Sequence, residues 1–116
     1  MTTKSVATNC GRILALTIEW HRDIERDFRR LDAEAVRRIK HFVEDDLPRF
    51  PDPYQRAKPL AGELRGLWRY RIGDYRLICE ITQDDDGHTV FFILAAHRGQ
   101  VYSSKHTRAT QNRRPN

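Results

Sequence analysis

The chain has 116 residues, of which 39% are hydrophobic and 32% charged, so it is expected to form one globular domain rather than a disordered chain. No apolar run approaches the roughly 18 residues that a membrane helix needs, and the first residues lack the apolar stretch of a secretory signal, so we expect a cytoplasmic protein. The formal net charge is +5, and all of the surplus lies from residue 97 onward, where five basic residues and no acidic one occur. This excess indicates an anionic partner such as nucleic acid, although an acidic protein or a merely solvated tail fits as well.

The first half of the chain predicts one strand and two helices. Residues 1–11 show no periodic pattern and are expected to be a disordered extension, whereas residues 12–19 are apolar and β-branched enough for a strand. Asp32 is placed to cap the second helix, which Pro48 ends. The first helix carries an apolar stripe at helical spacing, formed by Trp20, Ile24, Phe28 and Leu31.

The second half predicts a meander of three strands after a long proline-rich connection at residues 48–65. A two-residue turn at Gly73 and Asp74 joins strands at 67–72 and 75–82, and a third strand covers 88–96. The order β-α-α-β-β-β predicts an α+β domain with two helices packed on an antiparallel sheet of about four strands, the first strand beside the last.

This domain is expected to span residues 12–104, followed by a basic and disordered tail at 105–116. Of the two cysteines, Cys10 falls in the extension and Cys79 in a strand, so no disulfide, metal site or cofactor is expected.

The tight turn places arginines side by side. It sets Arg71 opposite Arg76, and the alternation of side chains along a strand adds Arg69 to the same face. The alternate residues are expected to pack against the helices, among them Tyr70, Leu77 and Cys79, a small buried hydrophobic residue. Like charges that face each other in a sheet cost a few tenths of a kcal/mol or more. Either the arginines spread into solvent, or they form an oxyanion site, because the guanidinium fork matches phosphate in two-point contacts.

A second group of polar side chains follows the last strand. His97 can exchange a proton near neutral pH, and Tyr102 can stack on a base or donate a hydrogen bond. Each of these residues taken alone is more often an ordinary surface or packing residue. If the last strand lies beside the arginine hairpin, His97, Arg98 and Tyr102 should approach the arginine face, and together they would suit a metal-independent site that cleaves phosphodiesters.

The stretch KPLAGELRGLWRYRIGDYRLICEI, followed by AAHRGQVY, resembles the RelE/ParE superfamily of bacterial toxins, in particular the RelE branch. The resemblance implies two helices over an antiparallel sheet. It also implies a toxin that cleaves messenger RNA, usually in the ribosomal A site, and that an acidic antitoxin holds inactive. The implied chemistry is attack of a ribose 2′-hydroxyl on the adjacent phosphate.

Roles follow from the resemblance by position. Arg69 and Arg71 match paired basic residues on the family's second strand, Arg76 matches the basic residue after the hairpin, and Arg98 and Tyr102 match the last motif. The best-known members carry lysine where this chain has Arg69 and Arg71, and arginine does not deprotonate in proteins.

The general base is therefore unassigned, with His97 as the first candidate and Tyr102 as the second. Two other functions stay open: a ParE-like inhibitor of DNA gyrase, and a catalytically silent module that only binds an antitoxin.

Overall fold

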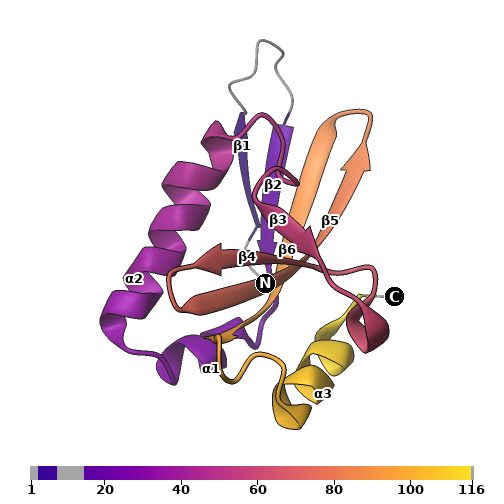
Figure 1. Cartoon of the computed structure of the whole chain (residues 1–116). Helices are drawn as coiled ribbons and strands as arrows, with labels where there is room; N and C mark the ends of the chain where they lie inside the picture. The colour runs from indigo at the N-terminus through magenta and orange to yellow at the C-terminus, as the bar shows by residue number, and fades with distance from the viewer. Residues whose placement is uncertain (1–2, 8–14, 116) are drawn as a thin grey trace.

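The computed structural model describes residues 3–7 and 15–115, with side chains from residue 15 onward (Figure 1). The strands and helices are β1 (Thr3–Ala7), β2 (Ala15–Trp20), α1 (Ile24–Arg29), α2 (Ala33–His41), β3 (Ala57–Pro59), β4 (Trp68–Ile72), β5 (Tyr75–Asp84), β6 (Gly87–His97) and α3 (Ser104–Arg113). Short π-helical or 3₁₀ turns occupy Phe42–Asp46, Leu47–Arg49 and Gly62–Leu64. None of the helices in this described part is long and apolar enough to span a membrane.

The strands form one sheet in the order β1-β2-β6-β5-β4-β3. The α+β class and the order of the predicted elements are confirmed, as is the position of β2 beside β6. The sheet is mixed, however, because β2 runs parallel to β6 while every other pair is antiparallel. The direction of β2 could not be deduced from its composition, since the same apolar strand can pair either way.

Two strands lie where none was expected. β1 falls within the extension at residues 1–11, so the prediction of disorder was wrong for Thr3–Ala7; residues 1, 2 and 8–11 lie outside the described part, as do 12–14 of the predicted first strand. β3 interrupts the long connection and pairs with β4. It escaped prediction because it is three residues long and ends at Pro59.

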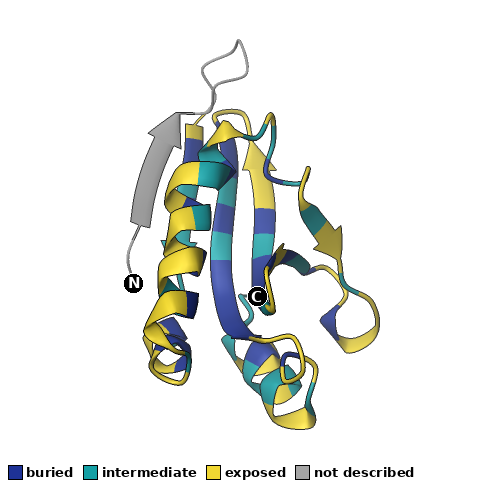
Figure 2. Ribbon diagram, turned by 60° about the vertical axis from the view of Figure 1, so that its left-hand side comes forward, coloured by how far each residue is buried: buried dark blue, intermediate teal, exposed yellow. Residues whose placement is uncertain are grey.

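Helices α1 and α2 cover one face of the sheet (Figures 1 and 2). Asp32 caps α2 as predicted, since its Oδ1 accepts a hydrogen bond of 2.8 Å from the backbone N–H of Ala35. Trp20 ends β2 and does not start a helix, but its ring packs 5.8 Å from that of Phe28 and 4.7 Å from that of Phe92. All four residues of the predicted stripe lie in the core or pack against it, but Trp20 belongs to the strand before the helix.

Both faces of the sheet carry a hydrophobic core. The face toward α1 and α2 buries one side of the hairpin, including Tyr70, Leu77 and Cys79, as the alternation predicted. The opposite face buries Leu67, Ile78, Ile93, Leu94 and Val101. A β-bulge shifts the β5–β6 register between Ile78 and Cys79, which lets the consecutive residues Ile93 and Leu94 join the same cluster.

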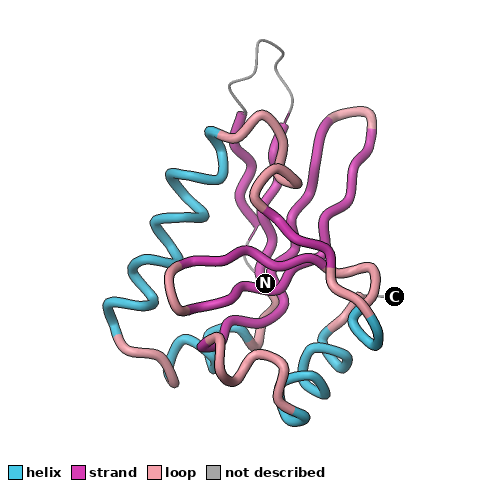
Figure 3. The backbone as a smooth tube through the Cα atoms, in the orientation of Figure 1, coloured by secondary structure: helices cyan, strands magenta, loops and turns pink. Residues whose placement is uncertain are grey.

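The prediction of a disordered tail at 105–116 was wrong for residues 105–113, which belong to α3 (Figure 3), and Ala109 of this helix packs against the second core. Ser103 caps the helix by accepting a hydrogen bond from the backbone N–H of His106. At its other end, Arg113 donates hydrogen bonds of 2.7 and 3.1 Å to the two carboxylate oxygens of Asp27 on α1. That buried ion pair joins residues 86 positions apart, so no local pattern could indicate it. Residue 116 lies outside the described part.

The ion pair also completes the hydrogen bonding of the central strand. β6 continues past Trp20, the last residue of β2, and from there on no strand of the described residues pairs with it on that side. Asp27 accepts a hydrogen bond of 3.1 Å from the N–H of Ala95, and Arg113 donates one of 3.1 Å to the carbonyl of Ile93. A buried backbone group without a hydrogen bond is costly, and these two side chains supply the missing partners. They thereby hold α1 and α3 to the edge of β6 that lacks a strand partner.

Candidate functional site

The arginine pair sits where the sequence predicted it. Arg71 and Arg76 are direct cross-strand partners beside a turn in which Gly73 has a φ of +57°, a conformation that favours glycine. Arg76 is buried, and its Nη1 donates hydrogen bonds of 3.0 Å to the carbonyl of Gly73 and 2.9 Å to that of Tyr75. The turn therefore fixes this guanidinium group in one place.

Four other predicted residues influence the charge of Arg76. Burial lowers the pKa of Arg76, and the charges of Arg71, Arg69 and Arg98 lower it further, whereas Tyr102 opposes that shift. A depressed pKa means that the positive charge of Arg76 is poorly compensated by its surroundings. An anion bound among these groups would relieve the repulsion, which is the property expected of an oxyanion site.

Arg98 approaches the same turn from the loop after β6. Its backbone N–H donates a hydrogen bond of 2.8 Å to the carbonyl of Asp74, and its Nε lies 3.8 Å from the Asp74 carboxylate. Both side chains of this ion pair are mostly exposed, so the pair contributes little stability and leaves the guanidinium group accessible.

Tyr102 follows on that loop and is 49% exposed, the one exposed large hydrophobic residue among those described. An aromatic ring left open to solvent beside a cationic cluster is suited to stacking on a nucleic acid base. Tyr102 comes four residues after Arg98, on the loop that meets the arginine turn.

His97 does not join this cluster. It is the cross-strand partner of Tyr75, and its ring packs edge-on to that of Tyr75 with centroids 5.6 Å apart. Tyr75 packs against the core under α1 and α2, whereas Arg76 and its partner Ala96 point to the other face. The expectation that His97 faces the arginines was therefore wrong, because a one-residue step along a strand reverses the side.

The ring of His97 is also engaged locally. Its Nδ1 accepts a hydrogen bond of 3.1 Å from the backbone N–H of Gly99. The hydrogen bond thus ties this nitrogen to the loop that follows β6.

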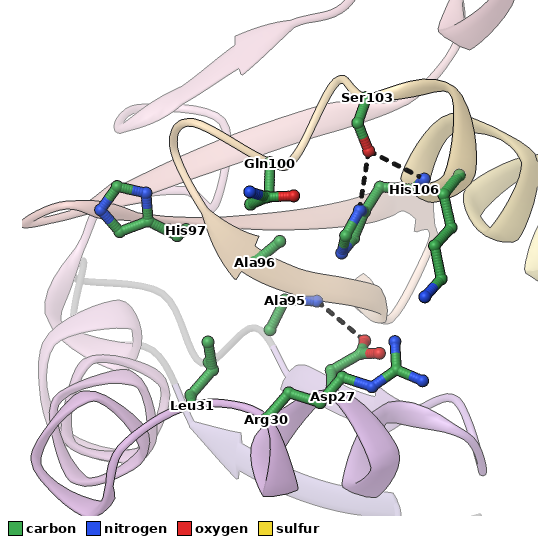
Figure 4. A pocket seen from close by; sticks show the side chains of 10 residues that line it. Asp27, Arg30, Leu31, Ala95, Ala96, His97, Gln100, Ser103 and His106 are labelled. Carbon is green, nitrogen blue, oxygen red and sulfur yellow. Dashed lines mark hydrogen bonds between the residues drawn. The ribbon is translucent and has the colours of Figure 1, made fainter.

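His97 instead lines a cavity of about 500 Å³ between α1, the end of β6 and α3 (Figure 4). Its lining includes the apolar residues Leu31 and Ala95. Ser103 and His106 also line it, with Ser103 Oγ 2.9 Å from His106 Nδ1. Burial lowers the pKa of His106. This cavity lies away from the arginine pair.

Two further cations were missed from the sequence. Lys58 on β3 is the cross-strand partner of Arg69, and with Arg56 it lines a cavity of about 250 Å³. Arg69, Arg71 and Phe42 complete the lining, so four cations and no carboxylate surround the space. The missing signal was β3 itself, since residues 56 and 58 were assigned to a connection without regular structure.

No three His, Cys, Asp or Glu side chains gather in a metal-binding arrangement among the residues that the structure describes. Cys79 is fully buried, and burial raises the pKa of its thiol well above the ordinary value. It behaves as a small hydrophobic side chain of the core, as predicted. Cys10 lies outside the described residues.

Known proteins that are similar to this chain are toxins. Residues 18–102 match the family model of the ParE toxin of the type II toxin-antitoxin system parDE. Toxin RelG of Mycobacterium tuberculosis (strain ATCC 25618 / H37Rv) is 33% identical over 86 residues, which are 74% of this chain and 94% of RelG. The chain belongs to the RelE/ParE superfamily.

Two more members of the RelE/ParE superfamily are similar. Toxin RelE of the same organism is 36% identical over 77 residues, covering 66% of this chain and 75% of that toxin. The crystal structure of the toxin-antitoxin complex RelBE2 of M. tuberculosis contains a chain with 30% identity and a TM-score of 0.58, covering 70% of this chain and 95% of that one. These relatives place the protein near the RelE branch of the superfamily.

Proposed function

We propose that this member of the superfamily is a toxin of a type II toxin-antitoxin system and cleaves messenger RNA on the ribosome. The observation that carries the proposal is the buried guanidinium group of Arg76, which two hydrogen bonds hold in the turn, opposite Arg71. The like charges of Arg69, Arg71 and Arg98 act on this group, and Tyr102 follows Arg98 on the same loop. A superfamily member that acts without nucleic acid chemistry has no evident need for this cluster.

The proposed reaction is an internal transesterification. The ribose 2′-oxygen attacks the adjacent phosphorus, the bond from phosphorus to the 5′-oxygen breaks, and the products are a 2′,3′-cyclic phosphate and a 5′-hydroxyl end. The transition state carries one more negative charge on the phosphoryl oxygens than the substrate does. Arg71, Arg76 and Arg69 would stabilise that charge, because prearranged donors aimed at developing charge are among the strongest catalytic devices.

Two protons must also move, one from the 2′-hydroxyl and one to the leaving 5′-oxygen. Arginine is a poor base, and His97 lies on the other face of the sheet. Of the six candidate side chains, Tyr102 remains as the group able to exchange a proton at this place. As the phenolate, Tyr102 would take the proton of the 2′-hydroxyl and then give it to the leaving 5′-oxygen, to which Arg98 would donate a hydrogen bond.

An antitoxin is the expected partner, since the similar RelBE2 chain is part of a toxin-antitoxin complex. The net charge of +5 favours an acidic partner segment, which could occupy the arginine cluster when RNA is absent. Such a toxin would act in the cytoplasm, where ribosomes and messages occur.

Primer extension on messenger RNA from cells that express the protein without antitoxin tests the proposal. Wild type should produce new cuts within reading frames, and the Arg76→Ala, Arg98→Ala double variant should not. Growth arrest without any cuts would contradict the proposal and favour gyrase inhibition, for which the match to the ParE family model is the supporting observation. Supercoiling by purified gyrase in the presence of the protein would then test gyrase inhibition. If the protein caused neither cleavage nor inhibition, an antitoxin-binding module would be the remaining function.

A further inference from the structure

A second groove adjoins the arginine cluster on the side of α3. It has a volume of about 430 Å³ and is lined by Glu63, Tyr102, Ser104, Thr107, Arg108 and Gln111. Tyr102 belongs to this groove and comes four residues after Arg98, whose backbone N–H is hydrogen-bonded to the Asp74 carbonyl in the arginine turn, so one loop connects the groove with the arginine cluster. A nucleotide whose phosphate lies among the arginines could therefore extend its base over Tyr102 into the groove.

Glu63 and Arg108 face this space without compensating each other. Neither side chain takes part in an ion pair within 4.0 Å or in a side-chain hydrogen bond in the portion of the chain that the structure describes. Both residues are exposed, so their polar atoms are open to a ligand. The groove thus offers a carboxylate acceptor, a guanidinium donor and an aromatic wall.

These groups match one base better than the other three. Guanine alone presents two adjacent donors, N1–H and the 2-amino group, with an acceptor, O6, beside them. A carboxylate accepts both donors at once, and an arginine can donate to O6. Adenine and cytosine carry a ring nitrogen acceptor next to the amino group, which a carboxylate repels, and uracil has a single donor between two acceptors.

Side chains from the C-terminal part of the chain hold the backbone of Glu63 in place. The side-chain Nε2 of Gln111 on α3 donates a hydrogen bond of 2.6 Å to the Glu63 carbonyl, and Nη1 of Arg114 donates one of 3.4 Å to the same oxygen. Arg114 also donates to the carbonyl of Arg65. The 3₁₀ turn Gly62–Leu64 is therefore clamped to α3, which is itself anchored through Arg113. The clamp fixes the backbone position from which the exposed Glu63 carboxylate can reach a base in the groove.

From this geometry we infer that the groove is a guanine-binding subsite in which Glu63 accepts hydrogen bonds from the Watson–Crick edge of a guanine next to the scissile phosphate. Tyr102 stacks on that base and Arg108 donates to its O6. The inference deepens the proposed function and rests on it, since it concerns the RNA that the arginine cluster would bind.

Binding of short oligonucleotides with 2′-O-methyl riboses, followed by fluorescence anisotropy, tests the subsite without requiring cleavage. The series holds one guanosine, adenosine or inosine in an otherwise constant uridine sequence. Inosine retains N1–H and O6 but lacks the 2-amino group. Wild type should bind the guanosine oligonucleotide about tenfold more tightly than the adenosine one, with inosine between them.

Glu63→Gln should remove most of this preference. The control Glu44→Gln, which changes an exposed glutamate in the π-helical turn Phe42–Asp46, should keep it. Arg76→Ala should weaken binding of all three oligonucleotides alike. Equal binding of the three by wild type, absence of binding, or an unchanged preference in Glu63→Gln would overturn the inference. A guanosine preference in a protein that cleaves no message would support the subsite and contradict the ribonuclease, so the two claims fail separately.

Discussion

The ion pair between α1 and α3 should be the most costly polar contact to break. In Arg113→Ala the Asp27 carboxylate keeps one donor, the N–H of Ala95, and loses hydrogen bonds of 2.7 and 3.1 Å. The side chains of Asp27 and Arg113 are 6% and 13% exposed, so water cannot replace the lost partner. Breaking a buried pair in this way costs roughly 3–5 kcal/mol, and we expect about 3 kcal/mol because Arg113 keeps slight contact with solvent.

Urea unfolding followed by tryptophan fluorescence measures this loss. The matched control is Arg37→Ala, which removes an exposed pair with Glu34 at 3.0 Å and should cost less than about 0.5 kcal/mol. A double variant, Asp27→Asn with Arg113→Met, should be more stable than Arg113→Met alone, because the uncompensated charge is gone. A cost below about 1 kcal/mol for Arg113→Ala would refute the account of how α3 is held.

Three further predictions follow from individual side chains. Burial lowers the pKa of His106 below its ordinary value of 6.5, so protonation favours the unfolded chain. The free energy of unfolding should therefore fall as the pH drops below about 6.5, and it should fall more gently in His106→Gln. An equal pH dependence of the two proteins in urea titrations would contradict this. Gly87 has a φ of +144° and lies against the Ala15 carbonyl, so Gly87→Ala should cost roughly 1–3 kcal/mol of stability in urea unfolding. Gly62 has a φ of +63° but open space around it, so Gly62→Ala should cost less, and a larger cost for Gly62→Ala would contradict this prediction. His97→Gln should keep message cleavage within about threefold of wild type while Tyr102→Phe lowers it at least about tenfold, and the opposite result would return the base to His97.

Much of the fold could be predicted because its signals are local. Alternation along the hairpin placed Arg71 opposite Arg76 and assigned Tyr70 and Leu77 to the core, and the structure has that register. The Asp32 cap was equally local, since it depends on residues three positions apart.

The errors concern features set by distant contacts. α3 contains no strong apolar pattern, and it is held by Asp27, 86 residues away. β3 is too short to carry a period, and so Lys58 was overlooked as a neighbour of Arg69. The side on which His97 lies followed from the register of β5 with β6, which starts at the Tyr75–His97 pair and which no single strand reveals.

The candidate site shows the same division. Arg69, Arg71 and Arg76 lie on one hairpin and could be grouped from the sequence, whereas the groove with Glu63 depends on contact between a 3₁₀ turn and α3, 48 residues apart. Local patterns thus predicted where charge accumulates, and tertiary structure was needed to find what surrounds it.

The central claim is that the arginine cluster cleaves RNA through its 2′-hydroxyl. The most direct measurement uses purified translating ribosomes, programmed with an end-labelled message, and identifies the ends that the protein produces. We predict fragments with a 2′,3′-cyclic phosphate and a 5′-hydroxyl for wild type, and none for Arg76→Ala. An intact message, 3′-hydroxyl ends, or equal cleavage by Arg76→Ala would contradict the account.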